Sequence, residues 1–351
     1  DTDRSRGVGD VYKRQIIMTV LTALTIITTV IMGLLLYNRF KMAIKQTAVT
    51  NTENMVENTV EKLDADLLNV RQITNAVNYN IIQEYDISSR DFNRQFSLLY
   101  EINADKIQSM ALYDDKGNLL TAEPVTVQKD AVEPSEQDWY QDAEADIENI
   151  HFSIPHIQNL FVDGTYRYYW VVSLSRSVDI NDGEQPGSGV LLVDMKYSVI
   201  EDTLARINDA SNGIYYYLCN RDGQMIYHPR GTDMDRGYFR EEYRAAATYE
   251  DGTYELTVNG RTSNVIVNSV AYTGWKVVGV VPESVQIASI NRFRYYIITT
   301  VIILMMMLLG VNRIISKKIS RPILKLNESV KAYEAGGPTC LLYTSDAADE
   351  A

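Results

Sequence analysis

The sequence contains few of the residues that build covalent or metal-bound frameworks. Its 351 residues include 2 cysteines and 3 histidines, so neither a disulfide-dense scaffold nor a metal site is predicted. Basic residues are also in deficit, because 33 Lys and Arg stand against 46 Asp and Glu and the net charge is -13. A chain of this charge lacks a basic face for a polyphosphate, so nucleic acid is not an expected partner.

Motifs of catalysis are missing as well. The sequence has no phosphate-cradling glycine loop and no G-x-S-x-G nucleophile motif. Asp114, Asp115 and Asn118 lie in one turn, but the other ligand positions of a calcium loop are absent, which favours a solvated turn. We therefore expect no cofactor and no enzymatic activity in this stretch of chain.

Both ends of the sequence carry the same short DNA element. Asp10–Gln15 back-translates to a sequence whose reverse complement, shifted by one base, encodes Cys340–Ser345. We expect residues 1–15 and 340–351 to be sequencing-adapter translation, with the gene continuing beyond both, and resequencing tests this. Cys219 is then the lone cysteine, so no intrachain disulfide is expected.

Two uncharged runs predict membrane-spanning helices. Residues 16–37 carry no charge over a length that covers the roughly 30 Å hydrocarbon core of a bilayer. A second span is predicted over 295–315, opening on the interfacial pair Tyr295 and Tyr296. The alternative for the first run is a signal peptide, but it is too long and lacks a small-residue cleavage site, which favours an anchor.

Charge sets the expected orientation. A basic cluster follows the second span, which the positive-inside rule assigns to the cytoplasm: Arg313, Lys317, Lys318, Arg321 and Lys325. Arg39, Lys41 and Lys45 indicate the opposite orientation, but long loops are translocated largely regardless of their charges. We therefore predict a plasma-membrane protein with residues 38–294 outside the cytoplasm and the C-terminus inside.

A stalk helix is predicted over residues 38–85. Apolar side chains recur there in alternating steps of four and three, with Thr74 filling one gap: Val56, Val60, Leu63, Leu67, Val70, Val77 and Ile81. Such a seam can pair with the same helix of a second chain in a homodimer, cover the chain's own sheets, or do both at different heights of the stalk. The periodicity leaves these alternatives open.

An internal repeat follows the stalk. Residues 112–120 match residues 218–226 as strand, polar turn closed by glycine, and strand. Each copy ends on an apolar strand, at 189–195 and 275–281, and Asp251-Gly252 and Asn259-Gly260 are predicted hairpin turns of the second copy. The pattern predicts two tandem α+β modules, over 86–208 and 209–290.

This layout resembles the double Cache sensors of bacterial receptors, in which a stalk helix precedes two PAS-like modules. The tail Ile319–Leu326, with Val330 and Gly336, looks like the start of a HAMP linker, whose first helix we place at 316–339. The resemblance gives Pro322, Leu326 and Val330 a role in signal transmission. The proline opens the helix, and Leu326, Val330 and Tyr333 follow at steps of four and three, the spacing of a parallel helical bundle.

The resemblance also implies a ligand site in the first, membrane-distal module. Asp138-Trp139-Tyr140 with Ala143 is similar to the aromatic signature of Cache pockets, and Tyr166 to Trp170 crowd the next predicted strand before Ser173. We expect Trp139, Tyr140, Tyr168, Trp170 and Ser173 to contact a small polar extracellular ligand. Core filling is the alternative for Trp139 and Tyr140, and Arg176 is expected to form a surface ion pair.

Asp194 is the sixth expected contact. It ends an apolar strand where the second module has hydrocarbon, at about Val281, and a carboxylate there could bind an ammonium or hydroxyl group. The alternative is a cap on the helix predicted at 197–207. The amino-acid-binding branch of the family has an arginine shortly before the Trp-Tyr pair, where this chain has Glu136 and Gln137, so sugars, amines and other small polar ligands are favoured over α-amino acids.

The function implied is the sensor half of a dimeric transmembrane receptor. We predict a sensor histidine kinase that acts on a response regulator through a catalytic region beyond this chain. The alternatives are a methyl-accepting chemotaxis receptor, a diguanylate cyclase sensor, and a surface binding protein that signals nothing.

Overall fold

The computed structural model describes residues 2–146, 149–162, 167–181, 186–208, 213–236, 248–258, 260–285, 294–311 and 313–314. The chain divides into two units, Asp1–Lys45 with Ile287–Ala351, and Gln46–Gln286. The predicted HAMP helix with Pro322, Leu326 and Val330, and the predicted adapter at 340–351, lie outside the described residues.

The first unit contains two helices long and apolar enough to cross a membrane: the N-terminal part of α1 (Thr2–Val77) and Arg294–Val311. Thr25 and Thr29 donate their hydroxyls to carbonyls one turn back, which satisfies these polar groups within the helix. Gly33 allows close packing, because a Cβ there would lie 3.4 Å from Cγ2 of Val301.

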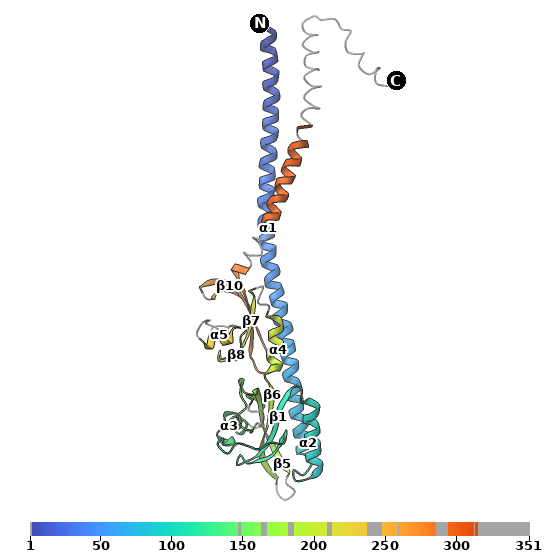
Figure 1. The fold of residues 1–351 in the computed structure, drawn as a ribbon, viewed down its shortest axis with the longest axis vertical. Helices are drawn as coiled ribbons and strands as arrows, with labels where there is room; N and C mark the ends of the chain where they lie inside the picture. The colour runs from blue at the N-terminus through green and yellow to red at the C-terminus, as the bar shows by residue number, and fades with distance from the viewer. Residues whose placement is uncertain are drawn as a thin grey trace, which may run out of the picture. The chain divides into compact units, whose positions relative to one another are not determined.

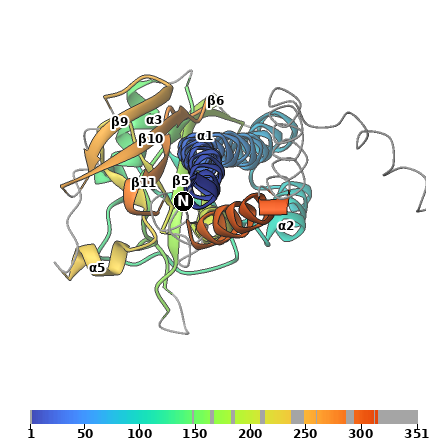
Figure 2. The same cartoon turned by 90° about the horizontal axis from the view of Figure 1, so that it is seen from above.

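In the second unit, α1 is followed by two antiparallel sheets, as Figure 1 shows. The α-helix ends at Val77 and continues as a π-helix, η1 (Asn78–Ile82), so the helical stalk ends before the predicted Tyr85. The helix α2 (Arg90–Asn103) follows, and the Ser89 hydroxyl caps it by accepting the Phe92 amide at 3.1 Å. Viewed along α1, the helix α2 lies on one side and the strands β9 to β11 on the other (Figure 2).

The first sheet has the strand order β2-β1-β6-β5-β3, with β4 also paired to β5. Its strands are β1 (Ile107–Asp114), β2 (Leu119–Glu123), β3 (His151–Phe152), β4 (His156–Ile157), β5 (Trp170–Asn181) and β6 (Pro186–Lys196). Between β2 and β3 lie the short 3-10 helix η2 (Pro134–Glu136) and the helix α3 (Asp138–Ala145). Strand β5 begins at Trp170, so the prediction that residues 167–169 are part of this strand was wrong.

The second sheet follows α4 (Ser198–Ile207) and has the order β8-β7-β11-β10-β9. Its elements are β7 (Tyr215–Cys219), β8 (Met225–Tyr227), α5 (Gly231–Asp235), β9 (Gly252–Val258), β10 (Arg261–Ser269) and β11 (Lys276–Pro282). Gly260, with φ of 73°, closes the β9–β10 hairpin as predicted, whereas Gly252 begins β9 and makes no hairpin turn.

The internal repeat is confirmed in detail. In the first copy the Asp114 carboxylate accepts the amides of Lys116 and Asn118, and in the second the Asn220 side chain accepts the amides of Asp222 and Gln224. The glycines that close the two turns have φ angles of 79° and 77°. The same side-chain chemistry therefore folds both turns, and the predicted α+β fold with a long N-terminal helix and two sheet modules is confirmed.

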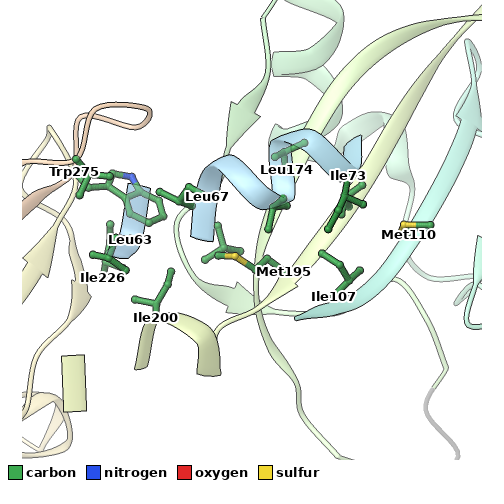
Figure 3. Packing of buried hydrophobic residues seen from close by; sticks show 14 of the residues in the cluster. Leu63, Leu67, Ile73, Ile107, Met110, Leu174, Met195, Ile200, Ile226 and Trp275 are labelled. Carbon is green, nitrogen blue, oxygen red and sulfur yellow. The ribbon is translucent and has the colours of Figure 1, made fainter. Parts of the chain in front are cut away.

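One hydrophobic core joins α1 to both sheets. The seam residues Val56, Leu63 and Val70 are fully buried in it, and Thr74 is buried with its hydroxyl donated to the Val70 carbonyl at 3.0 Å. Figure 3 shows Leu63 and Leu67 of α1 beside Ile226 and Trp275 of the second module, with Met195 of the first module nearby. The seam residues therefore pack against the chain's own sheets, one of the arrangements that the periodicity left open.

Candidate ligand-binding site

The first sheet has a second buried face, turned away from α1. Alternate residues of β6 separate the two faces, because Leu191 and Val193 pack in the core with α1 while Val190 and Leu192 pack on the other side. We call the buried residues of that other side the outer cluster: Ala111, Tyr113, Trp139, Tyr140, Ala143, Leu160, Phe161, Val190 and Leu192.

Aromatic rings of β1 and α3 dominate the outer cluster. The ring centroids of Tyr113 and Trp139 are 5.5 Å apart, and those of Trp139 and Tyr140 are 5.7 Å apart in an edge-to-face arrangement. Two hydrogen bonds hold α3 in place: the Ser175 hydroxyl donates to the Trp139 carbonyl at 2.7 Å, and the Tyr140 hydroxyl donates to the Asp114 carbonyl at 2.7 Å.

Asp194 lies at the end of this face as a buried carboxylate. Only 1% of its surface is exposed. Ser109 donates its hydroxyl to Oδ2 at 2.7 Å, and Ser173 donates its hydroxyl to Oδ1 at 2.5 Å. The register explains this arrangement, since both serines stand directly opposite Asp194 on the flanking strands β1 and β5.

His156 extends this polar group. Its Nε2 lies 3.3 Å from the Ser173 hydroxyl, and its Nδ1 lies 3.0 Å from the Ile154 carbonyl and 3.3 Å from the Ser153 hydroxyl. Burial is the main cause that raises the pKa of Asp194, while the two serine hydrogen bonds and His156 lower it. No Lys or Arg in the described residues forms an ion pair with Asp194, so His156 is the cationic side chain that acts on this buried carboxylate.

Tyr113 adds an unused hydroxyl beside the carboxylate. The Tyr113 side chain is fully buried, and its hydroxyl has no hydrogen-bond partner among the described residues. Burial, followed by the charge of Asp194, raises the pKa of Tyr113. A buried hydroxyl without a partner is costly, and a ligand that bonds to it would recover that cost.

The structure brings together four of the six predicted contacts. Trp139 and Tyr140 are in the outer cluster, and Ser173 and Asp194 form the polar group at its end. Tyr168 and Trp170 are outside this assembly, with 81% and 52% of their surfaces exposed, and the Trp170 ring lies 6.3 Å from that of Tyr197.

The alternative role for Asp194, a helix cap, is wrong. Tyr197 is the N-cap of α4, no side chain caps that helix, and both Asp194 oxygens accept serine hydroxyls instead. The strand register also moves the equivalent position in the second module from Val281 to Val280. Val280 shares a face with Val278 as Asp194 does with Leu192, whereas Val281 packs toward α1.

Tyr113, Ser109 and His156 were not predicted from the sequence to belong to the site. These residues come from β1 and β4, and only the pairing of distant strands places them near Asp194. A usable signal existed for Ser109, because it directly precedes the run Met110–Tyr113 at the centre of strand β1. Across the described residues, no group of three or more His, Cys, Asp or Glu side chains is placed to hold a metal ion.

Removing the hydroxyl of Tyr113 or of Tyr140 is expected to shift stability in opposite directions. Tyr113→Phe removes a hydroxyl without a partner and should stabilise the unliganded protein by about 1 kcal/mol. Tyr140→Phe, its matched control, loses the bond to the Asp114 carbonyl and should destabilise by about 1 kcal/mol. Denaturant unfolding of both variants measures this, and equal signs would contradict the assignment of Tyr113 as unpaired.

This combination of a helix, two similar modules and a polar site in the first module defines a class of protein. The family model described as Cache domain, in the dCache_1 form, matches residues 40–290. The chain belongs to the double Cache family, and its second unit is an extracellular ligand-sensing domain of a membrane protein.

Relatives of known type are chemotaxis receptors. A probable methyl-accepting chemotaxis protein of Bacillus thuringiensis subsp. konkukian (strain 97-27) is 20% identical over 77% of this chain and 39% of its own length. The methyl-accepting chemotaxis protein TlpB of Bacillus subtilis (strain 168) is 23% identical over 65% of this chain and 30% of its own length. The chain thus spans about a third of the length of these relatives.

A solved structure has the same fold. The ligand-binding domain of the Pseudomonas fluorescens chemoreceptor CtaA, in complex with L-isoleucine, covers 71% of this chain and 98% of its own chain. The sequence identity is 18% and the TM-score is 0.50, so the likeness concerns the fold.

Proposed function

We propose that this chain is the sensor part of a methyl-accepting chemotaxis receptor, and that a small polar extracellular ligand binds beside Asp194 in the first module. The observation that carries the proposal is the buried Asp194 carboxylate, which has two hydroxyl donors and no ion-pair partner among the described Lys and Arg side chains. A ligand that presents an ammonium group would neutralise it inside the protein.

The chemistry of the site favours an amine over an α-amino acid. CtaA was solved with L-isoleucine, a ligand with both an ammonium and a carboxylate group. In this chain Glu136 and Gln137 precede the Trp-Tyr pair, and neither supplies a cation for a ligand carboxylate. The Tyr113 hydroxyl offers one further hydrogen bond, which suits an amine that also carries a hydroxyl or a second polar group.

The relatives favour a chemotaxis receptor over the histidine kinase predicted from the sequence. Both curated relatives are methyl-accepting chemotaxis proteins. The proposed topology has α1 and the helix at Arg294–Val311 as the two spans, with the sheets outside and the C-terminal region in the cytoplasm. A homodimer and a HAMP connection are part of this proposal, as expected for a receptor that couples ligand binding to a bistable helical bundle.

A chimera tests the proposal. Residues 16–339 are joined to the signalling region of Bacillus subtilis TlpB in a strain without its own receptors, and chemotaxis is measured toward ethanolamine, putrescine, L-serine and glycerol. We expect a response to at least one amine and none to glycerol. A response to L-serine alone would contradict the ligand class, and no response to any compound would contradict the receptor assignment, provided that TlpB itself restores taxis in that strain.

A further inference from the structure

Arg176 of β5 points to the opposite side of the sheet from Asp194. It stands opposite Leu191, a residue of the core with α1. Its Nη1 donates to Asn75 Oδ1 at 2.9 Å, and its guanidinium carbon lies 5.6 Å from the centroid of the Tyr79 ring. These contacts place the guanidinium group where α1 passes into the π-helix η1.

Within the part of the chain that the structure describes, two buried polar atoms without a partner occur at this junction. They are Nε of Arg176 and Oδ1 of Asn78, and only 3% of the Asn78 surface is exposed. Asn75, which Arg176 contacts, is three residues before Asn78, so the two amides share the helix face that looks toward β5. Native proteins leave few buried polar atoms without a partner, and the buried Nε of Arg176, a donor, lacks an acceptor here, whereas Oδ1 of Asn78 is an acceptor that lacks a donor.

The charge at the junction is not neutralised by the described residues. No described carboxylate forms an ion pair with Arg176, so the predicted surface ion pair was wrong. An amide oxygen and an aromatic face each interact with a guanidinium group, but neither carries a full negative charge. A partly buried cation is stabilised far more by an anion than by a neutral water molecule.

We propose that a small oxyanion binds between β5 and the α1–η1 junction, at a site separate from the ligand site at Asp194. Since Asn75 engages Nη1, the edge formed by Nε and Nη2 of Arg176 is available for a bidentate contact with a carboxylate or a phosphate. Because Oδ1 of Asn78 would repel an anion, binding at this site requires the Asn78 amide to turn about χ2, so that Nδ2 donates to the oxyanion. Single π-helical turns often mark functional positions, and η1 is one such turn.

Binding of acetate and of inorganic phosphate to the full chain in nanodiscs tests this site, and the two probes distinguish a planar carboxylate from a tetrahedral anion. We expect saturable thermal stabilisation by at least one of them, with a dissociation constant at least tenfold weaker in Arg176→Met. Arg71→Gln is the matched control, because Arg71 also stacks on a tyrosine, at 5.3 Å from the Tyr272 ring centroid, and should bind as the wild type does.

A second measurement needs no substitution. In protein labelled with 15N-arginine, the Nε–H resonance assigned to Arg176 should shift on titration with the anion, and that of Arg71 should not. Saturable stabilisation that Arg176→Met leaves unchanged would overturn the proposal. So would a wild-type protein in which neither acetate nor phosphate moves the Arg176 resonance, since a bridging water would then satisfy both atoms.

Discussion

Asp194→Asn should weaken the binding of an amine ligand by on the order of 100-fold, because losing one member of a buried charge pair costs about 3 kcal/mol. The substitution keeps the size of the side chain and an oxygen that can accept one of the two serine hydroxyls, so the fold should persist. Titration of the receptor with the amine that the chimera identifies measures the effect. Asp179→Asn, an exposed position on β5, is the control and should bind normally. Equal affinities in both variants would remove Asp194 from the site.

The same variant should change how the stability of the unliganded protein depends on pH. The folded-state pKa of Asp194 is raised above its usual 3.8, so the folded protein holds this proton more tightly than the unfolded chain does. The contribution of protonated Asp194 to the stability of the folded protein is complete below pH 3.8 and is lost as the pH rises through the folded-state pKa. Asp86 and Asp114 have lowered pKa values, and their contribution is lost only as the pH falls below 3.8. Asp194→Asn should therefore flatten the curve above pH 3.8, and an unchanged slope there would contradict the raised pKa of Asp194.

Gly279→Val should destabilise the second unit by about 1–3 kcal/mol, the usual cost of overpacking a core. A Cβ at this position of β11 would lie 2.6 Å from Thr52 Cγ2 and 2.9 Å from Val56 Cγ2, and both of those side chains are buried on α1. Valine suits a strand in other respects, so the loss measures the close approach of β11 to the helix. Denaturant unfolding gives the change in free energy.

Two further variants separate this steric effect from others. Gly187→Val, on β6, has no atom within 4 Å of its new Cβ and should be neutral or slightly stabilising. Thr52→Ser removes the nearest methyl group and keeps the hydroxyl that donates to the Ala48 carbonyl at 2.9 Å. It should restore part of the stability lost in Gly279→Val, and a double variant no more stable than the single one would argue against the contact with Thr52.

The sequence predicted those parts of the molecule that depend on short-range patterns. The seam of α1, the two glycine-closed turns and the strands that follow them each depend on residues within about ten positions of one another. Asp194 could be identified from the sequence because the equivalent position in the second copy of the internal repeat holds an apolar residue. The seam's partner could not be predicted, since a heptad pattern specifies a buried stripe but not the surface that covers it.

The rest of the site depends on contacts between distant strands. Ser109 and Asp194 are 85 residues apart, and no local pattern reports that β1 and β6 pair in this register. Tyr168 and Trp170, in contrast, were predicted as ligand contacts from a local pattern but lie outside the outer cluster and the polar group at its end. A dense run of aromatic residues suggested a pocket wall, but strand β5 begins only at Trp170, and both side chains face solvent.

The single core described above limits how this protein can be cut. Leu63, Leu67 and their neighbours on α1 pack against both sheets, so neither module has a complete hydrophobic core without this helix. A fragment ending after β6 would expose the helix surface that packs against Trp275 and Ile226, and one starting at β7 would lack α1. Either half expressed alone should aggregate, because apolar surface that is buried in the whole domain would be exposed to solvent. Any soluble derivative for crystallisation therefore has to keep the whole segment from the middle of α1 to β11.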